Sequence, residues 1–220
     1  MARERVRMNM GQVNIPTGGV LCRCGEAPRF WYGAVDGLLK WSVSHRDGRS
    51  VTLGGLSAGS WFEEGALLLG TPHRADIIAL RPSRVALMPI ETFIWLHAHE
   101  RSFSDFLLRQ INERMQWFIG NLSASHLLGP DVNVAWALVG LFHPWLYPGS
   151  DPHLKVSQEE IANLSGISRP RCNAALRRLA GEGMIEIEYG GLRVLDLQAL
   201  RQFVVASSGG IFSGSLTESR

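Results

Sequence analysis

Short apolar runs separated by glycine-containing turns fill the first half of the chain. Between Phe30 and about Leu96 these runs alternate with turns such as Asp36-Gly37 and Asp47-Gly48. Evenly spaced short strands of this kind are typical of an antiparallel sandwich or roll. Asp47-Gly48 suits a hairpin, because both residue types tolerate the positive φ of a type I′ turn. We therefore predict an α+β protein that begins with an antiparallel, jelly-roll-like β-roll.

The pattern changes to helical spacing after Glu91, and no proline interrupts it from Ser102 to about Ser125. Apolar residues there recur every three or four positions, which places them on one face of a long helix. This stripe consists of Leu107, Ile111, Met115, Phe118 and Leu122. A second apolar flank is expected to face the roll and consists of Phe103, Phe106, Trp117 and Ile119. Two flanks favour a coiled-coil-like dimer seam, and the alternative is an ordinary helix that covers the roll.

Leu128-Gly129-Pro130-Asp131 interrupts this helical pattern, because glycine and proline end helices and proline or aspartate begins them. We interpret the segment as a domain boundary and a hinge, with Gly129 as its flexible member. The predicted domains are a sensing β-roll at 15–100, a dimerisation helix with the hinge at 101–128, a DNA-binding domain at 129–205, and a flexible tail rich in serine and glycine at 206–220.

A helix-turn-helix is predicted by the local signals that follow. Ser157 and Glu160 have the spacing of a capping box, which starts a helix. Ser165-Gly166 supplies a turn, and Ser168 is placed to cap a second helix. Pro170 falls in the first turn of that helix, where its missing N–H does no harm. Two helix starts around a glycine turn indicate this motif.

The second of these helices carries its apolar residues on one side and arginines without acids on the other. Guanidinium groups without a nearby carboxylate favour phosphates and guanine edges, and the alternative is an ordinary solvated face. The candidate DNA-binding residues are Gln158, Ser168, Arg169, Arg171, Asn173, Arg177 and Arg178.

A hairpin is predicted directly after this basic helix. Ile185, Ile187 and Tyr189 alternate with acidic residues, Gly190-Gly191 suits a tight turn, and an apolar run from Leu192 returns. Such a hairpin after a helix-turn-helix forms the wing of a winged helix.

Composition adds little beyond these patterns. A net charge of +2 on 220 residues does not argue for nucleic acid by itself, so the local arginine face carries that inference. Three cysteines do not make a disulfide framework, which agrees with a reducing compartment. No apolar stretch reaches the length of a membrane span, and the first twelve residues do not read as a secretory signal. We therefore expect a cytoplasmic protein without a membrane partner.

From about Gly19 to Phe203 the sequence resembles the Crp/Fnr superfamily. The match is strongest from Val156 to Arg169, continues through Leu176, Leu179 and Gly183-Met184-Ile185, and in the roll includes Val35-Asp36-Gly37 and Leu56 to Phe62. The resemblance implies a homodimeric transcription regulator and not an enzyme. It also implies an inverted-repeat operator in double-stranded DNA, contact with RNA polymerase, and a small-molecule effector held in the roll.

The resemblance further assigns base recognition to Arg169 and to the positions of Pro170 and Ala174. The family's best-known members carry a glutamate at the Pro170 position and an arginine at a neighbouring site. The usual consensus half-site is therefore not expected. Arg171, Asn173 and Arg177 are candidates for the missing contacts.

The resemblance also places an effector cassette in the roll, at Glu63, Glu64, Arg74, Ala75 and, from the dimer helix, Phe118. Glu64 and Arg74 match the residues that hold ribose and phosphate in cyclic-nucleotide-binding members, whereas Ala75 replaces a serine and Glu63 a glycine. Like charges about 4 Å apart repel by about 4 kcal/mol near a protein surface. Cyclic AMP is therefore expected to bind weakly or not to be the effector, which stays unidentified, and no metal is expected. The alternative is a cyclic-nucleotide receptor that responds to cyclic AMP or cyclic GMP.

Two other chemistries have candidate residues. A cupin-like metal enzyme would use His97 and His99, but i and i+2 side chains of a helix point about 200° apart. Cys22 and Cys24 are too few for an iron-sulfur cluster, which leaves a thiol switch or two incidental residues. His73 beside Arg74 is a candidate pH or haem sensor, and the alternative is an ordinary turn residue.

Overall fold

The computed structural model describes residues 2–209 and 211–212, which form two compact units. The first unit contains the residues up to Glu113 and the segment Pro144–Ser150, and the second contains Arg114–His143 and the residues from Asp151 onward. This division differs from the expected domain boundaries, because it falls inside a helix rather than at Leu128–Pro130. No helix among the described residues is long and apolar enough to cross a membrane.

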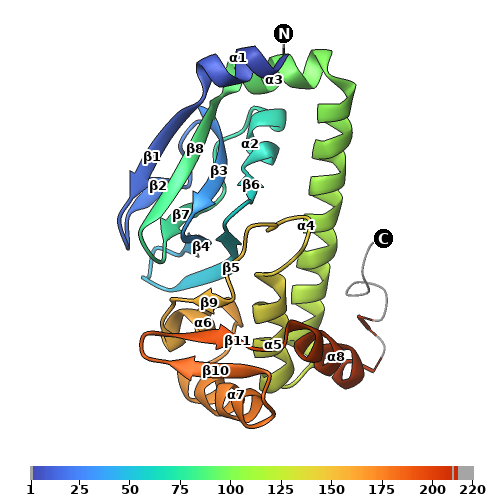
Figure 1. The fold of residues 1–220 in the computed structure, drawn as a ribbon. Coiled ribbons are helices and arrows are strands. Elements are labelled where there is room, and N and C mark those ends of the chain that lie inside the picture. The colour runs from blue at the N-terminus through green and yellow to red at the C-terminus, as the bar shows by residue number, and fades with distance from the viewer. Residues whose placement is uncertain (1, 210, 213–220) are drawn as a thin grey trace. The chain divides into compact units, whose positions relative to one another are not determined.

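Two four-stranded sheets make up the roll of the first unit, with strand orders β1-β8-β3-β6 and β2-β7-β4-β5 (Figure 1). The pairs described in both sheets are antiparallel, which confirms the predicted roll. The strands are β1 (Gly11–Ile15), β2 (Val20–Cys22), β3 (Phe30–Asp36), β4 (Leu38–Ser44), β5 (Ser50–Ser57), β6 (Trp61–Phe62), β7 (Asp76–Ala79) and β8 (Ser83–Pro89).

Two predicted turns of the roll have different outcomes. Gly37, between β3 and β4, has a φ of 103°, and a Cβ there would lie 2.1 Å from the Ser83 Oγ, so glycine is required. The predicted type I′ turn at Asp47-Gly48 is wrong, since only Gly48 has a positive φ among those two residues. Asp47 instead accepts hydrogen bonds from the Arg49 backbone N and Nε, at 3.0 and 2.8 Å. Backbone hydrogen bonds from the Gly48 N to the His45 carbonyl, at 3.0 Å, and from the His45 N to the Arg49 carbonyl, at 2.7 Å, close the loop, and the Asp47 side chain adds to them.

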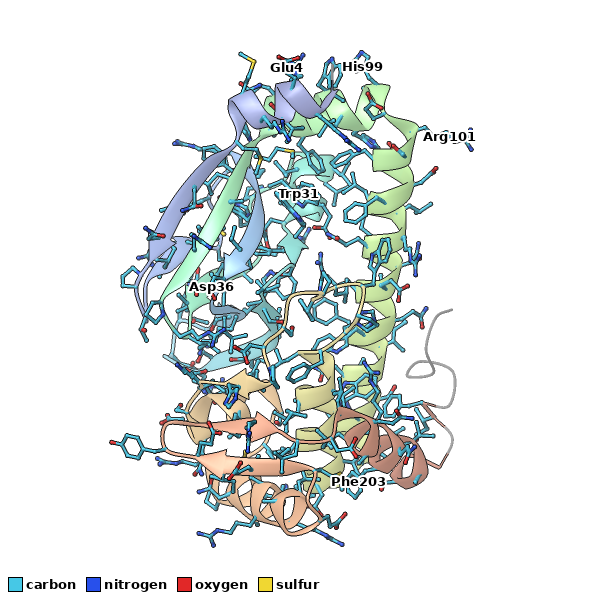
Figure 2. All side chains as sticks on the ribbon, in the orientation of Figure 1. Glu4, Trp31, Asp36, His99, Arg101 and Phe203 are labelled. Atoms are coloured by element: carbon cyan, nitrogen blue, oxygen red, sulfur yellow. The ribbon has the colours of Figure 1, made fainter. Side chains whose placement is uncertain are left out.

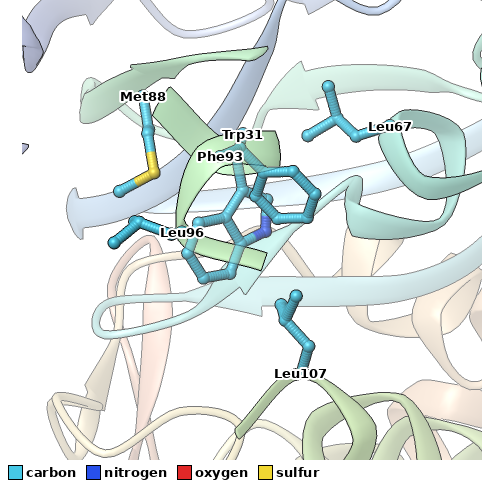
Figure 3. Close-up of a cluster of buried hydrophobic side chains, with 6 residues drawn as sticks. All are labelled: Trp31, Leu67, Met88, Phe93, Leu96 and Leu107. Atoms are coloured by element: carbon cyan, nitrogen blue, oxygen red, sulfur yellow. The ribbon is translucent and has the colours of Figure 1, made fainter. Parts of the chain in front are cut away.

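The core of the first unit is centred on Trp31 of β3. Its ring centroid lies 4.4 Å from that of Trp61 and 5.3 Å from that of Phe93. Figure 2 shows Trp31 in the interior of this unit. The buried cluster comprises Trp31, Leu67, Met88, Phe93, Leu96 and Leu107 (Figure 3). The helices that contribute to this unit are α1 (Ala2–Asn9), α2 (Glu64–Leu69), α3 (Ile90–His99) and the first half of α4 (Arg101–Leu127).

Helix α4 corrects the predicted dimer stripe. Leu107 is only 2% exposed, so it cannot face a second copy. Ile119, which was expected to face the roll, is instead 51% exposed. The outward apolar stripe of α4 therefore comprises Leu108, Ile111, Met115, Ile119 and Leu122. The predicted period was correct, but it does not show which of two adjacent leucines faces the core.

The second unit contains the predicted winged helix and two elements that the sequence patterns had not indicated, β9 and α8. A three-stranded sheet has the order β10-β11-β9. The elements are α5 (Pro130–Gly140), β9 (His153–Leu154), α6 (Gln158–Leu164), α7 (Arg169–Gly181), β10 (Ile185–Glu188), β11 (Gly191–Val194) and α8 (Leu197–Ser207). In Figure 1 the β10–β11 hairpin lies beside α7.

The turn of the wing is Tyr189-Gly190 rather than the predicted Gly190-Gly191. Gly191 pairs with Glu188 in the ladder, and Gly190 supplies the positive φ of 78°. A Cβ on Gly191 would lie 2.4 Å from the Leu154 carbonyl oxygen. Gly191 is therefore needed for the close approach of β9, not for the turn.

Reciprocal tryptophan–glycine contacts join the second half of α4 to α5. A Cβ on Gly140 would lie 2.3 Å from the Trp117 Nε1, and one on Gly120 would lie 2.4 Å from the Trp136 ring. Phe212 stacks on Trp136 at 4.1 Å and is 2% exposed. Trp117, which was expected to face the roll, thus packs on α5.

The tail expected to be flexible at 206–220 is ordered in part. Ser207 still belongs to α8, and Phe212 is buried. Residues 210 and 213–220 lie outside the described part. The serine- and glycine-rich composition concealed one aromatic side chain that the α4–α5 pair buries.

Gly120→Ala is expected to lower the free energy of unfolding by about 1 to 3 kcal/mol, because the added methyl overlaps the Trp136 ring. Gly181→Ala is the matched control, since nothing lies within 4 Å of a Cβ at that helical position. Urea denaturation followed by circular dichroism measures both. Equal stability of the two variants would contradict the packing described.

Candidate functional site

Helices α6 and α7 form the predicted helix-turn-helix. Ser157 is the N-cap of α6, and its side chain accepts a hydrogen bond from the Glu160 N at 3.2 Å. Gly166 turns the chain with a φ of 66°. Ser168 occupies the N-cap position of α7, but its side chain makes no capping hydrogen bond. That expected cap is wrong, so the Ser168 hydroxyl is not committed to the end of its own helix.

The buried face of α7 determines which of its residues are exposed to solvent. Cys172, Ala175, Leu176 and Leu179 are fully buried. Burial raises the pKa of the Cys172 thiol to about 11, so this thiol stays protonated and unreactive at neutral pH. The exposed side carries Arg169, Pro170, Arg171, Ala174, Arg177 and Arg178.

One member of this basic face is already paired with acids. Arg178 donates to the Asp131 carboxylate of α5 at 2.7 Å, and its Nε lies 3.7 Å from Glu182. The expectation of an acid-free face is therefore wrong for Arg178. Within residues 2–209 and 211–212, no ion pair involves Arg169, Arg171 or Arg177. Their charges remain available to a polyanion.

Gln158 and Asn173 border this face and are half-buried. Gln158 is the first residue of α6, and its carbonyl oxygen lies 3.8 Å from the Cys172 sulfur. The buried Asn173 Oδ1 has no partner among the described atoms. The structure thus places all seven predicted DNA-binding residues in one motif, with Arg178 partly neutralised.

The wing adds a feature that the sequence patterns did not single out. Arg193 of β11 pairs with Glu186 and lies 3.6 Å from Glu188, and the Glu186 contact raises the pKa of Arg193. His153 lies 3.4 Å from Glu188. Tyr189 at the tip is fully exposed. The carboxylates of the wing are thus offset locally, which lowers the repulsion between this hairpin and a phosphate backbone.

Glu63 is the first residue of the predicted effector cassette. It is the non-glycine residue with a positive φ among the described residues, at 74°. Its carboxylate accepts from the Trp41 Nε1 at 2.9 Å and lies 2.5 Å from the His73 Nδ1. The His73 side chain of this pair is 1% exposed and the Glu63 side chain is 10% exposed. The left-handed backbone explains why a glycine suits this position, and its strain costs about 1 to 3 kcal/mol.

Glu64, the expected ribose ligand, is enclosed by the core. Its carboxylate accepts from the Trp31 Nε1 and the Gln110 Nε2, each at 3.4 Å. Gln110 also donates to the Trp61 carbonyl at 2.8 Å, which fixes this arrangement. Glu64 is thus hydrogen-bonded without any ligand.

The remaining predicted cassette residues differ in exposure. Arg74 is exposed, and Ala75 is buried. Phe118 belongs to the second unit, half-buried with its ring 5.5 Å from that of Trp117. The sequence reasoning had not paired His73 or Trp41 with Glu63, because these residues lie on separate segments.

The cysteines and histidines that were candidates for redox or metal chemistry lie in ordinary structural surroundings. Cys22 is buried, and desolvation together with Glu63 raises its pKa, so it is no thiolate. Cys24 is exposed. His97 and His99 both lie on α3, where His99 bonds to the Trp95 carbonyl at 2.9 Å. The helix keeps the two imidazoles apart.

Two family models match the chain in the order of its parts. Residues 12–100 match the cyclic nucleotide-binding domain, and residues 134–203 match the Crp-like helix-turn-helix domain. The chain belongs to the Crp/Fnr superfamily. Members of this family are DNA-binding transcription regulators rather than enzymes.

Solved structures of this family share the fold. FixK2 from Bradyrhizobium japonicum is 15% identical with a TM-score of 0.74, over 88% of this chain and 96% of that one. A CRP-family transcriptional regulator from Thermus thermophilus is 22% identical with a TM-score of 0.66, over 90% and 99%. The c-di-GMP-responsive regulator CLP from Xanthomonas campestris is 21% identical with a TM-score of 0.62, over 88% and 97%. No curated protein sequence matches the chain.

Arg177→Ala is expected to lower the salt dependence of DNA binding by about one unit of slope, since one unpaired charge is lost. Arg178→Ala is expected to lower the slope less, because Asp131 and Glu182 already offset its charge. Fluorescence anisotropy with a labelled duplex over a salt series measures both. A larger effect for Arg178→Ala would contradict this assignment.

Proposed function

We propose that this protein is a homodimeric, cytoplasmic, non-enzymatic transcription regulator that binds an inverted-repeat operator in double-stranded DNA and acts together with RNA polymerase. The observation that carries the proposal is the exposed face of α7. Arg169, Arg171 and Arg177 stand there without an acidic partner among the described residues, on a helix whose opposite side is fully buried.

Positions along the motif divide the proposed contacts. Arg169 begins α7, and a guanidinium there suits the O6 and N7 of a guanine in the major groove. Exposed Pro170 and Ala174 offer apolar contact to thymine methyl groups. Gln158, Ser168 and Arg177 suit phosphates, which set the register of the protein on the duplex. This division predicts a half-site unlike the usual family consensus.

Dimerisation is supported by the outward stripe of α4. Leu108, Met115 and Leu122 are each more than half exposed, and they repeat at seven-residue intervals. Large apolar side chains exposed along one helix mark an association surface. A seven-residue repeat is the spacing of a coiled-coil seam between two helices.

Leu122→Glu is expected to convert the dimer to a monomer and to lower operator affinity at least tenfold, because two carboxylates would meet in the seam. Ile94→Glu is the control, since Ile94 is an exposed isoleucine on α3. Sedimentation velocity gives the mass, and anisotropy gives the affinity. Unchanged dimers of Leu122→Glu would overturn the proposed seam.

The operator itself tests the two-fold arrangement. Binding-site selection with the full protein should return inverted repeats whose half-site centres lie roughly 10 bp apart. Direct repeats or unstructured sequences would contradict the proposal.

We also propose that the effector in the roll is a small molecule other than cyclic AMP. Glu63 places a carboxylate in the cassette, where the family has glycine, and Trp41 and His73 already satisfy it. A cyclic phosphodiester would meet this negative charge at close range. A cyclic-nucleotide receptor is the second candidate function, favoured by the match of residues 12–100.

Calorimetric titration is expected to detect no micromolar binding of cyclic AMP or cyclic GMP to the unaltered dimer. Glu63→Gly removes the carboxylate and suits the left-handed backbone, so it should raise affinity for cyclic AMP at least tenfold. Glu63→Gln is the control that removes the charge but keeps the side chain. Low-micromolar binding to the unaltered protein, with tighter operator binding, would favour the second candidate.

A further inference from the structure

The segment Pro144–Ser150, named the strap below, packs in a different unit from its neighbours in sequence. Helix α5 ends before it at Gly140, and β9 begins after it at His153, and both belong to the second unit. The strap itself belongs to the first unit. Leu146 and Tyr147 within it are 2% and 3% exposed. Burial of this degree makes the strap a packed element rather than a solvated loop.

The first anchor of the strap is Trp145. The Arg109 guanidinium lies 3.8 Å from the centre of the Trp145 ring, within the range of a cation–π contact. The Phe106 ring lies 5.5 Å away. Arg109 and Phe106 both belong to the first half of α4, so the start of the strap is held against that helix.

The second anchor is the turn between β5 and β6, at Ser57 to Gly59. The Ser57 and Ser150 hydroxyl oxygens are 2.8 Å apart, and the Gly149 N donates to the Ala58 carbonyl at 3.2 Å. Gly59 has a φ of 86°, and a Cβ there would lie 2.9 Å from the Gly149 N. The backbones of the turn and of the strap are in direct contact here, and this close approach requires glycine at position 59.

The turn that holds the strap leads directly into the effector cassette. Gly59 is followed by Ser60, by β6, and then by Glu63 at the start of α2. The Ala34 N donates to the Ser60 carbonyl at 2.8 Å, and the Gly59 N donates to the Ala34 carbonyl at 2.8 Å. Only a short, hydrogen-bonded segment therefore separates Glu63 from the turn that contacts the strap, so a displacement of Glu63 would be passed on to the strap.

The strap is stiff enough to pass on a displacement. Ser150 donates from both its N and its hydroxyl to the Tyr147 carbonyl, at 3.3 and 3.1 Å, which closes a turn around Pro148. Pro144 and Pro148 each fix one backbone torsion. Little of an imposed shift would be absorbed inside the segment.

Both covalent ends of the strap lead to elements that hold the DNA-contacting surface. After it, His153 of β9 pairs with Arg193 of the wing strand β11. Before it, α5 carries Asp131, which binds Arg178 of α7. The C-terminal end of the strap therefore leads to β9 and the wing, and its N-terminal end leads to α5, which binds α7.

We infer that the strap transmits the state of the effector cassette to the winged helix. A rearrangement at Glu63 alters the docking of the strap on Ser57–Gly59, and the strap then shifts β9 and α5. Coupling of this kind needs a contiguous element that both sites bias, and the strap is such an element. The inference rests on the proposed regulatory function.

Hydrogen exchange of the free full-length protein tests the inference without DNA. The proteins compared are the unaltered chain, Glu63→Gly, Trp145→Ala and the double variant. Glu63→Gly should speed exchange at least threefold in residues 58–69, 144–150 and 151–164. In the Trp145→Ala background, Glu63→Gly should still speed exchange in residues 58–69, but it should change the exchange rates of residues 151–164 by less than 1.5-fold.

Two further variants control for damage to the fold. Trp95→Ala removes another half-buried tryptophan of the first unit, one over which Arg5 lies at 4.7 Å, and it should leave the transmission intact. Ser150→Ala removes the hydroxyl contacts with Ser57 and with the Tyr147 carbonyl but keeps the backbone hydrogen bonds, and it should weaken the transmission at least twofold. Circular dichroism verifies folding of every variant.

Persistence of the full effect on residues 151–164 in the Trp145→Ala background would overturn the inference. So would a response of residues 58–69 to Glu63→Gly with none in residues 151–164. Operator affinity of the same proteins is a separate arm, so a failure to select any operator refutes the proposed function without affecting the exchange result.

Discussion

Different faces of helix α4 have to pack in the core of the roll, pack against α5, and remain exposed on the outside. In its first half Leu107 is buried in the core of the roll, and Gln110 binds Glu64. In its second half Gly120 receives the ring of Trp136 from α5. A helix advances about 100° per residue, so the side that fills these cores cannot also face a second copy. The outward stripe is what remains, and its apolar character is the reason to expect a dimer.

The cassette shows how one side chain changes the chemistry that a loop geometry offers. A left-handed backbone is needed at the start of α2, and Glu63 adopts it at an energetic cost. The cost is offset by hydrogen bonds that its carboxylate accepts inside the roll. A charge removed from water requires such partners, and under the proposed function the same partners hold the carboxylate where it would repel a phosphodiester. The proposed choice of ligand thus depends on how this one side chain is hydrogen-bonded.

The proposed DNA-contacting surface depends on which charges the fold neutralises. Arg178 and Arg177 are neighbours in sequence and both are exposed, yet only Arg178 reaches an acid of α5 among the residues described. In the wing, Arg193 offsets Glu186 and Glu188. The net charge of +2 therefore conceals a small set of α7 guanidiniums that have no acidic partner in the described part of the chain, and the proposed function rests on their position rather than their number.

The sequence by itself determined the antiparallel roll, the long helix, and the helix-turn-helix with its wing. These depend on local signals such as alternation, helical period, the Ser157 cap and the Gly166 turn, which act over a few residues. Only the tertiary structure decided that Leu107 rather than Leu108 enters the core and that Glu63 meets His73. It also decided that Arg178 meets Asp131 and that the strap packs with the roll. Periodicity fixes which residues share a face, but the partner that covers the face lies far away in sequence, and contacts between distant segments are set by packing and charge compensation in the folded chain.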